Sequence, residues 1–275
     1  MSEFSRRLGT GVIFFIVVIG STLLSHYTFA LLWLSLTLFG QLEFYRLIRK
    51  SGGNPQNITG VIAGFILFTS CFLYVQSDFK NYQWLVISPL ILFTIFIIEV
   101  FRKHKNPFFN IAYTITGIVY IAVPFSLLNF LVIDIDLFPT FRFKPWILLG
   151  ALLTMWAYDS WAYIIGSQIG KHKLYPSISP GKTWEGFFGG LVCSWLWSYL
   201  MYWMFGTIEW YDWLFIATIL ATVGTMGDLV ESKLKRSLEI KDSGNILPGH
   251  GGILDRFDAF LISIPFILFY LMVRF

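Results

Sequence analysis

The chain has 275 residues, of which 56% are hydrophobic, 19% are aromatic and only 13% are charged. This is far more apolar surface than a soluble domain of this size can bury, so the composition excludes an ordinary soluble protein. It indicates a protein that lies in a lipid bilayer, and the formal net charge of +4 then has to be interpreted from where the charges stand between membrane spans.

A membrane helix needs about 20 mostly apolar residues, and stretches of this kind follow one another along the whole chain with short polar breaks. We therefore predict an all-α polytopic membrane protein of about nine transmembrane helices. The predicted spans are 9–25, 27–45, 59–76, 84–101, 110–133, 146–168, 186–205, 213–231 and 253–273.

Basic residues are unevenly distributed between the two sides that these spans define. Of the 20 Lys and Arg residues, 16 fall at the N-terminus or after an even-numbered span, and only Lys80, Arg142, Lys144 and Arg274 fall on the other side. Cytoplasmic loops are enriched in Lys and Arg. We therefore expect a cytoplasmic N-terminus and an outer C-terminus. Because no organellar targeting segment is seen, we expect the cell's inner (plasma) membrane.

The first five predicted spans contain two notable acids, Glu43 and Glu99. Each stands three residues before an arginine, Arg46 or Arg102, and this spacing favours a helical ion pair near the inner membrane surface over a catalytic role. Cys71 and Cys193 lie in separate apolar spans, which favours plain packing over a disulfide or a zinc site.

The last four predicted spans are different, because they contain acids that are costly to place in a bilayer, about 2.5–3.5 kcal/mol each at a helix centre. Membrane acids that no base neutralises usually face water, protons or a metal ion. We therefore divide the chain into N-terminal transmembrane helices, 1–135, and a C-terminal catalytic transmembrane region, 136–275. The acids of this region are Asp159, Asp228, Glu231, Asp255 and Asp258.

The segment SPGKTWEG, residues 179–186, indicates an anion-binding helix start. Ser179 is expected to cap a helix that has Pro180 in its first turn, and free N–H groups beside Lys182 suit a phosphate. The triplet Gly181–Thr183 resembles the end of a Walker A loop, but Pro176 replaces the upstream glycine and no strand is expected before it, so we reject a P-loop. For Lys182 we favour a phosphate-binding role over a lysine that only marks the membrane face.

The segment that carries the most information about function is residues 232–258, SKLKRSLEIKDSGNILPGHGGILDRFD. Its dense glycines let backbone N–H groups approach an anion. Asp255 and Asp258 are expected on one helix face, and such oxygen ligands suit Mg²⁺ beside substrate phosphates. Just upstream, Glu231 is expected to pair with Lys235, four residues on, which leaves Asp228 for function.

His250 lies in the same stretch and could act as a general base or as a group that lines the site. A phosphate monoester, whose second pKa is about 6, is largely dianionic near neutral pH and needs no base to become a nucleophile. We therefore expect His250 to line the site.

The stretch 232–258 resembles the signature of the phosphatidate cytidylyltransferase (CDP-diacylglycerol synthase) family. The segment 179–186, the region of Asp159, and Asp228 are similar to further features of that family, so the resemblance covers the C-terminal half, and the N-terminal half matches in hydrophobicity only. The residues that carry the signature are Ser232, Leu234, Lys235, Arg236, Lys241, Asp242, Gly244, Leu247, Pro248, His250, Gly251, Gly252, Asp255, Arg256 and Asp258.

The resemblance implies a dimeric enzyme that transfers a cytidylyl group from CTP to phosphatidate, giving CDP-diacylglycerol and pyrophosphate, with magnesium as the required metal and potassium as its companion ion. It implies metal binding by Asp228 and Asp255 and catalytic roles for these two with Asp258 and Lys241. The substrate-binding residues expected are Asp159, Ser179, Lys182, Thr183, Glu185, Lys235, Arg236, Asp242, His250, Gly251, Gly252 and Arg256. We expect a polar cavity that faces the cytoplasm, contact with the bilayer, and no nucleic acid as a partner.

Two other functions stay open from the sequence. A secondary transporter would also place acids and glycines in broken helices, but its two halves would form a repeat, which is not seen here. A different lipid transferase, such as a polyprenol kinase or a cytidylyltransferase for another lipid acid, would share the chemistry.

Overall fold

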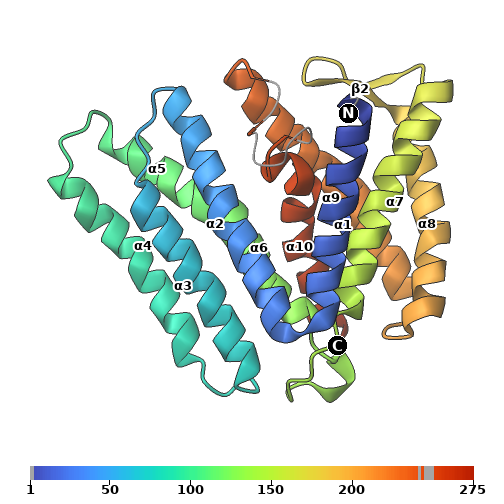
Figure 1. The fold of residues 1–275 in the computed structure, drawn as a ribbon, viewed down its shortest axis with the longest axis horizontal. Coiled ribbons are helices and arrows are strands. Elements are labelled where there is room, and N and C mark those ends of the chain that lie inside the picture. The colour runs from blue at the N-terminus through green and yellow to red at the C-terminus, as the bar shows by residue number, and fades with distance from the viewer. Residues whose placement is uncertain (1–2, 241–242, 245–250) are drawn as a thin grey trace. The chain divides into compact units, whose positions relative to one another are not determined.

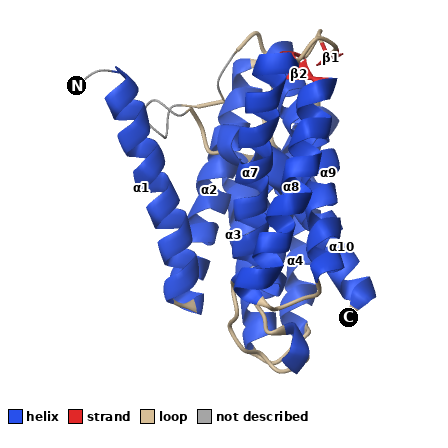
Figure 2. Ribbon diagram, turned by 90° about the vertical axis from the view of Figure 1, so that its right-hand side faces the viewer, coloured by secondary structure: helices blue, strands red, loops and turns tan. Residues whose placement is uncertain are grey.

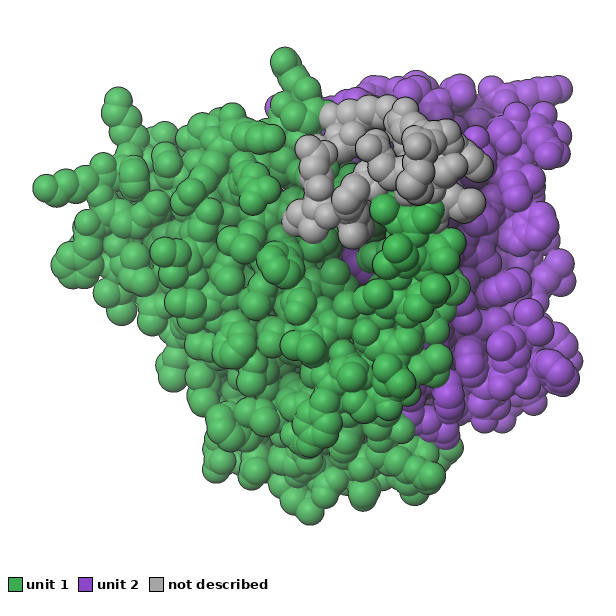
Figure 3. Space-filling view, in the orientation of Figure 1, with its two compact units in different colours: residues 1–143, 238–256 green, residues 144–237, 257–275 purple. Residues whose placement is uncertain are grey.

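The computed structural model describes residues 3–240, 243–244 and 251–275, which are mostly helical with one two-stranded ribbon (Figure 2). The chain divides into two compact units, residues 1–143 with 238–256 and residues 144–237 with 257–275 (Figure 3). This structural division differs from the predicted functional division at residues 135 and 136, which stays a prediction.

The first unit begins with the long helices α1 to α4, which Figure 1 shows in blue to green. A helical stretch follows in which α-helical, π-helical and 3-10 turns alternate. The elements of this unit are α1 (Glu3–Leu24), α2 (His26–Lys50), α3 (Asn57–Gln76), α4 (Gln83–Phe101), α5 (Pro107–Gly117), η1 (Ile118–Ala122), α6 (Val123–Leu127), η2 (Leu128–Leu131) and η3 (Ile135–Leu137).

The second unit contains the ribbon and three further long helices, and the last helix of the chain begins in the first unit and continues in the second. Its elements are α7 (Trp146–Ile169), β1 (Lys173–Tyr175), β2 (Ser179–Thr183), α8 (Trp184–Phe205), α9 (Trp210–Ser237) and α10 (Leu254–Arg274).

A helical stretch lies at each of the nine predicted spans, and the count of nine membrane crossings stays a prediction. Six helical stretches of the described chain are long and apolar enough to cross a membrane, which makes this a multi-pass membrane protein. These are Asn57–Gln76, Gln83–Phe101, Pro107–Leu131, Trp146–Ile169, Trp210–Ser237 and Leu254–Arg274.

In the first unit, a buried tyrosine determines how closely the helices approach. Tyr45 is buried and donates a hydrogen bond from its hydroxyl to the Thr114 carbonyl at 2.8 Å. A Cβ atom added at Gly60 or Gly117 would overlap the Tyr45 ring. Because lipid offers little hydrophobic drive between helices, small residues and interhelical hydrogen bonds hold such bundles together.

Glu99 forms the ion pair that its spacing predicts. Arg102 Nη1 lies 2.7 Å from Glu99 Oε2, which also accepts from Gln56 Nε2 at 2.7 Å, while Asn110 Nδ2 donates to Oε1 at 2.8 Å. The buried carboxylate is therefore satisfied by side chains of the first unit itself. Cys71 and Cys193 are both free, so the prediction that they form no disulfide is confirmed.

The start of α8 differs from the prediction. Residues Ser179–Thr183 form strand β2, which pairs antiparallel with β1, and the helix cap is Thr183, whose hydroxyl accepts from Gly186 N at 3.1 Å. The expectation that Ser179 caps a helix is therefore wrong, as is the expectation that no strand precedes this segment. Thr183 offers a second cap signal, and when it is used the preceding residues stay extended.

Close helix contacts in the second unit depend on Gly150. A Cβ at this position of α7 would overlap the ring of Trp213, which lies in α9 and is fully buried. A Gly150→Ala substitution should therefore lower the stability of the detergent-solubilised protein by about 1–3 kcal/mol, the usual cost of overpacking.

Thermal unfolding would measure this loss of stability. Gly20→Ala is the matched control, because nothing lies within 4 Å of a Cβ there and alanine favours a helix over glycine by roughly 0.5–1 kcal/mol. Equal unfolding temperatures for Gly150→Ala and the unmodified protein would contradict the packing described here.

Candidate functional site

The second unit contains a cavity of about 360 Å³. It lies among α7, the ribbon, α8 and α9, and one part of its wall is polar while another is apolar and aromatic. Its lining residues are Tyr158, Asp159, Ala162, Tyr163, Gly166, Ser167, Leu174, Ser179, Gly181, Lys182, Thr183, Gly186, Phe187, Thr225 and Asp228. Of the residues predicted to bind substrate, Asp159, Ser179, Lys182 and Thr183 therefore lie around one cavity.

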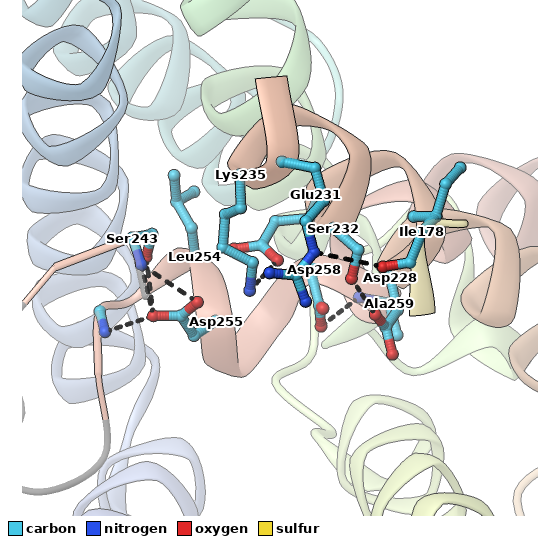
Figure 4. A network of polar contacts seen from close by, with 12 residues as sticks. Ile178, Asp228, Glu231, Ser232, Lys235, Ser243, Leu254, Asp255, Asp258 and Ala259 are labelled. Atoms are coloured by element: carbon cyan, nitrogen blue, oxygen red, sulfur yellow. Dashed lines mark hydrogen bonds and ion pairs between the residues drawn. The ribbon is translucent and has the colours of Figure 1, made fainter. Parts of the chain in front are cut away.

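Lys182 and Asp228 form an ion pair in the cavity wall. Lys182 is in β2 and Asp228 is in α9, and both side chains are partly exposed. Ser232, one helical turn beyond Asp228, donates its hydroxyl to Asp228 Oδ1 at 3.1 Å (Figure 4). Asp228 therefore has donors on more than one side, and the Lys182 ammonium stands where an anion in the cavity could reach it.

Carboxylates outnumber cations around this ion pair. Asp159 is exposed in the cavity wall. Asp258 belongs to the part of α10 that lies in this unit. It interacts electrostatically with Asp159, Asp228 and Lys182. Gly227 lets α9 approach α10 closely, because a Cβ there would lie 2.6 Å from the Asp258 carbonyl. Three carboxylates and one ammonium leave an excess of negative charge, which a bound cation would offset.

Among the described residues, no three His, Cys, Asp or Glu side chains converge closely enough to hold a metal ion together. The chemistry of the donors nevertheless fits magnesium, which takes one or two carboxylates and completes its shell with water and substrate phosphates.

Lys235 and Arg236, two basic residues of the signature, contact Glu231 of α9 and the residue before β2, respectively. Lys235 forms the predicted ion pair with Glu231, which is buried (Figure 4). Arg236 approaches the Ile178 carbonyl at 3.5 Å, just before β2. The prediction that Glu231 is neutralised by Lys235 is therefore confirmed.

In the first unit, Glu43 does not form the predicted pair with Arg46. Its buried carboxylate instead accepts hydrogen bonds from the Ser243 hydroxyl, from Ile253 N at 3.0 Å and from Leu254 N at 3.2 Å. N–H groups at the start of a helix lack partners within the helix, so they bind the Glu43 carboxylate in place of the arginine three residues on. The ion-pair interpretation of Glu43 is therefore wrong.

Asp255 is held by the same segment. It accepts hydrogen bonds from Ser243 N at 3.0 Å, from the Ser243 hydroxyl at 2.9 Å and from Gly252 N at 2.7 Å (Figure 4). Gly251 adopts a φ of +83°, which favours glycine. Asp255 belongs to the first unit and Asp228 to the second.

Comparison with known proteins identifies the family. The model of the cytidylyltransferase family matches residues 5–274, which is nearly the whole chain. The chain belongs to the cytidylyltransferase family. Membership extends to the N-terminal half, for which the sequence showed only a likeness in hydrophobicity.

Individual members of the cytidylyltransferase family are similar to this chain. A phosphatidate cytidylyltransferase of Bacillus subtilis (strain 168) is 32% identical over 275 residues, which covers 98% of each chain. The enzyme of the same name from Staphylococcus epidermidis (strain ATCC 12228 / FDA PCI 1200) is 42% identical over 168 residues, 60% of this chain and 61% of its own. That of Staphylococcus aureus (strain COL) is 40% identical over 167 residues, with the same shares.

Some residues predicted for this cytidylyltransferase site lie elsewhere or outside the described chain. Lys241, Asp242 and His250 fall outside the described residues. Glu185 is not in the cavity lining, and Arg256 is exposed. Three residues were not predicted from the sequence. Tyr158 and Thr225 share a hydrogen bond of 2.7 Å between their hydroxyls at the cavity wall. Ser243 could have been found, because it is a small polar residue directly after Asp242 of the signature.

Glu185 attaches the ribbon to the start of α8. It lies 2.6 Å from His172 Nδ1, and it accepts from His172 N at 3.2 Å. Hydrogen bonds from its own backbone N–H and from His172 lower the pKa of Glu185 from 4.5 to about 2. The pKa of Glu185 is therefore lower in the folded than in the unfolded protein. Its ionised carboxylate contributes fully to folding stability at a pH above 4.5, and this contribution is lost as the pH falls toward about 2.

We therefore expect the ribbon to resist pepsin at about pH 4 and to become susceptible as the pH approaches 2, while Glu185→Gln is cut already at about pH 4. Mass spectrometry of the cleavage products measures this. Glu209→Gln, an exposed glutamate at the other end of the unit's helices, is the control. An identical cleavage profile for Glu185→Gln and the unmodified protein would show that Glu185 does not attach the ribbon.

Proposed function

We propose that the chain is an enzyme that transfers a cytidylyl group from CTP to phosphatidate and releases pyrophosphate, which yields CDP-diacylglycerol. Membership of the cytidylyltransferase family and the full-length similarity to a phosphatidate cytidylyltransferase support this activity. The observation that carries it is the cavity in which Lys182 faces Asp228, because it joins an anion-binding ammonium with carboxylates at one wall.

The cavity wall matches both substrates in chemical character. The Lys182 ammonium can exchange its carboxylate partner for a substrate phosphate, since an ammonium binds either anion. Tyr163, Phe187 and Leu174 provide apolar and aromatic surface in the same cavity. A polar nucleotide and the head of a lipid could both be accommodated by such a wall, which we propose faces the cytoplasm.

Magnesium is the proposed metal, with potassium as a companion ion, and Asp228 and Asp255 are the proposed ligands. The excess of carboxylates around Asp228 and the hydrogen-bonded carboxylate of Asp255 support these assignments. When bound, the metal would offset charge on the triphosphate and on the departing pyrophosphate. Asp258 adds negative charge beside Asp228 and supports metal binding.

The side chains of the protein then position the reactants. The lipid phosphate attacks the α-phosphorus in line, and it needs no general base because it is itself an anion near neutral pH. Lys182, Lys235, Arg236, Lys241 and Arg256 are the proposed phosphate-binding cations, and alignment with electrostatic stabilisation supplies most of the catalysis.

The placement in the membrane is also proposed in part. The apolar helices make this a multi-pass membrane protein, and the bacterial relatives suit the inner membrane. We propose that all nine predicted spans cross it, that the N-terminus and the active site face the cytoplasm, and that the enzyme acts as a homodimer. The 16 of 20 basic residues on one predicted side support this orientation.

The activity is tested with purified protein, labelled CTP, phosphatidate and magnesium. We expect CDP-diacylglycerol and pyrophosphate, and loss of both when magnesium is chelated. Asp228→Asn and Asp255→Asn should each lower turnover by more than about 100-fold, beyond the effect typical of a residue that only supports a metal ligand.

Glu209→Gln, an exposed carboxylate outside the cavity, is the matched control for both variants and should keep full turnover. Release of CDP in place of pyrophosphate would show a kinase and overturn the proposed reaction. Normal magnesium-dependent turnover by Asp255→Asn would overturn its role as a ligand.

Lys182→Met tests the phosphate-binding role. Because a hydrogen bond to a charged group contributes about 1.5–3 kcal/mol, we expect turnover per KM for CTP or phosphatidate to fall by about 10 to 100-fold. Lys173→Met removes an exposed lysine from the neighbouring strand and should change neither value. If the two variants behave alike, Lys182 does not bind substrate.

A further inference from the structure

Glu43, in the N-terminal half, is hydrogen-bonded to the segment of the family signature. It lies in α2 and is only 1% exposed. Its carboxylate accepts hydrogen bonds from the Ser243 hydroxyl and from the N–H groups of Ile253 and Leu254, which lie 200, 210 and 211 positions away in the sequence. The Glu43 carboxylate therefore holds a segment of the signature and no neighbour in its own helix.

The contact is strong because of where the donors lie. The N–H groups at the start of α10 have no partner within the helix, and the positive end of the helix dipole favours an anion. Buried carboxylates persist when two or three such donors converge on them. Glu43, a residue of α2, thus accepts hydrogen bonds from N–H groups at the start of α10, as the side chain of an N-cap residue would.

Two glycines show that the segment is shaped around this carboxylate. A Cβ at Gly252 would overlap Glu43 Oε1, and a Cβ at Gly244 would lie 2.8 Å from Glu43 Oε2. Any other residue at these positions would push the backbone away from the carboxylate. The glycines of the signature therefore serve, in part, a close contact with Glu43.

The contact extends to Asp255 through Ser243. The Ser243 hydroxyl donates to Glu43 and lies within hydrogen-bonding distance of Asp255, at 2.9 Å. Ser243 N also donates to Asp255, and Figure 4 shows both bonds between Ser243 and Asp255. Gly252 N, which donates to Asp255 at 2.7 Å, directly precedes the two N–H groups that Glu43 binds. A shift of Glu43 would therefore displace the donors that orient the Asp255 carboxylate.

We propose that Glu43 is a positioning residue that orients Asp255 for magnesium binding by holding Ser243 and the start of α10. This proposal rests on the proposed role of Asp255 as a magnesium ligand. Glu43 touches neither substrate nor metal in it. Residues that orient a metal ligand typically contribute about 10 to 100-fold to metal affinity or activity.

The experiment compares Glu43→Gln with Glu99→Gln, a glutamate of the same unit that is also buried but is bonded to Gln56, Arg102 and Asn110. Hydrogen–deuterium exchange is measured in detergent for peptides that include Ile253 and Leu254, and the magnesium concentration for half-maximal turnover is measured in parallel. In Glu43→Gln we expect exchange there to quicken and half-saturation to rise, each by about tenfold or more. Glu99→Gln should change neither.

Ser243→Ala keeps the backbone bonds to Glu43 and removes the hydroxyl that joins it to Asp255, so it should raise half-saturation in the same direction and serves if Glu43→Gln does not fold. Unchanged exchange in Glu43→Gln overturns the proposal, as does unchanged magnesium half-saturation in both variants. If Asp255→Asn keeps a normal magnesium requirement, the role of Asp255 fails, whereas the exchange data still decide whether Glu43 holds the segment.

Discussion

An ionised carboxylate inside an apolar helical protein needs hydrogen-bond donors or a cation, and this requirement organises the structure. Glu99 and Glu231 meet it with neighbouring arginine or lysine side chains, and Glu43 meets it with hydrogen-bond donors of the signature segment. Asp228 has Lys182, but Asp159 and Asp258 add charge beside it that this lysine does not balance. Groups of the protein alone therefore satisfy Glu43, Glu99 and Glu231, whereas the unbalanced negative charge around Asp228 marks the cavity as the candidate site.

The charged groups of the cavity suit the chemistry of the cytidylyltransferase family. A reaction between a triphosphate and a lipid phosphate brings anions together, so the enzyme must supply cations and must hold them in place. Lys182 is held by a short ribbon whose attachment depends on Glu185 and on the Thr183 cap, while Asp255 is held by Ser243 and Gly252. In each unit, a residue proposed to act on phosphate or metal is therefore held by neighbouring groups that have no proposed part in the chemical step.

Local patterns in the sequence predicted the helix positions, the Glu231–Lys235 pair and the Glu99–Arg102 pair, because these depend on hydropathy over one span or on residues one helical turn apart. Sequence also brought Asp159, Ser179, Lys182, Thr183 and Asp228 into one functional set, and they line one cavity. The partners of Glu43 could not be predicted, since they lie about 200 residues away and consist mainly of backbone N–H groups. The Ser179 cap failed because two cap signals compete within five residues.

The proposed function requires carboxylates of the C-terminal half to hold a divalent cation against the phosphates of CTP. Manganese has the same preference for carboxylate and water ligands as magnesium, so its paramagnetic resonance signal reports directly on the site. With purified protein and CTP, we expect phosphorus hyperfine coupling on bound manganese that disappears in Asp228→Asn and in Asp255→Asn. Coupling that persists unchanged in both variants would contradict it.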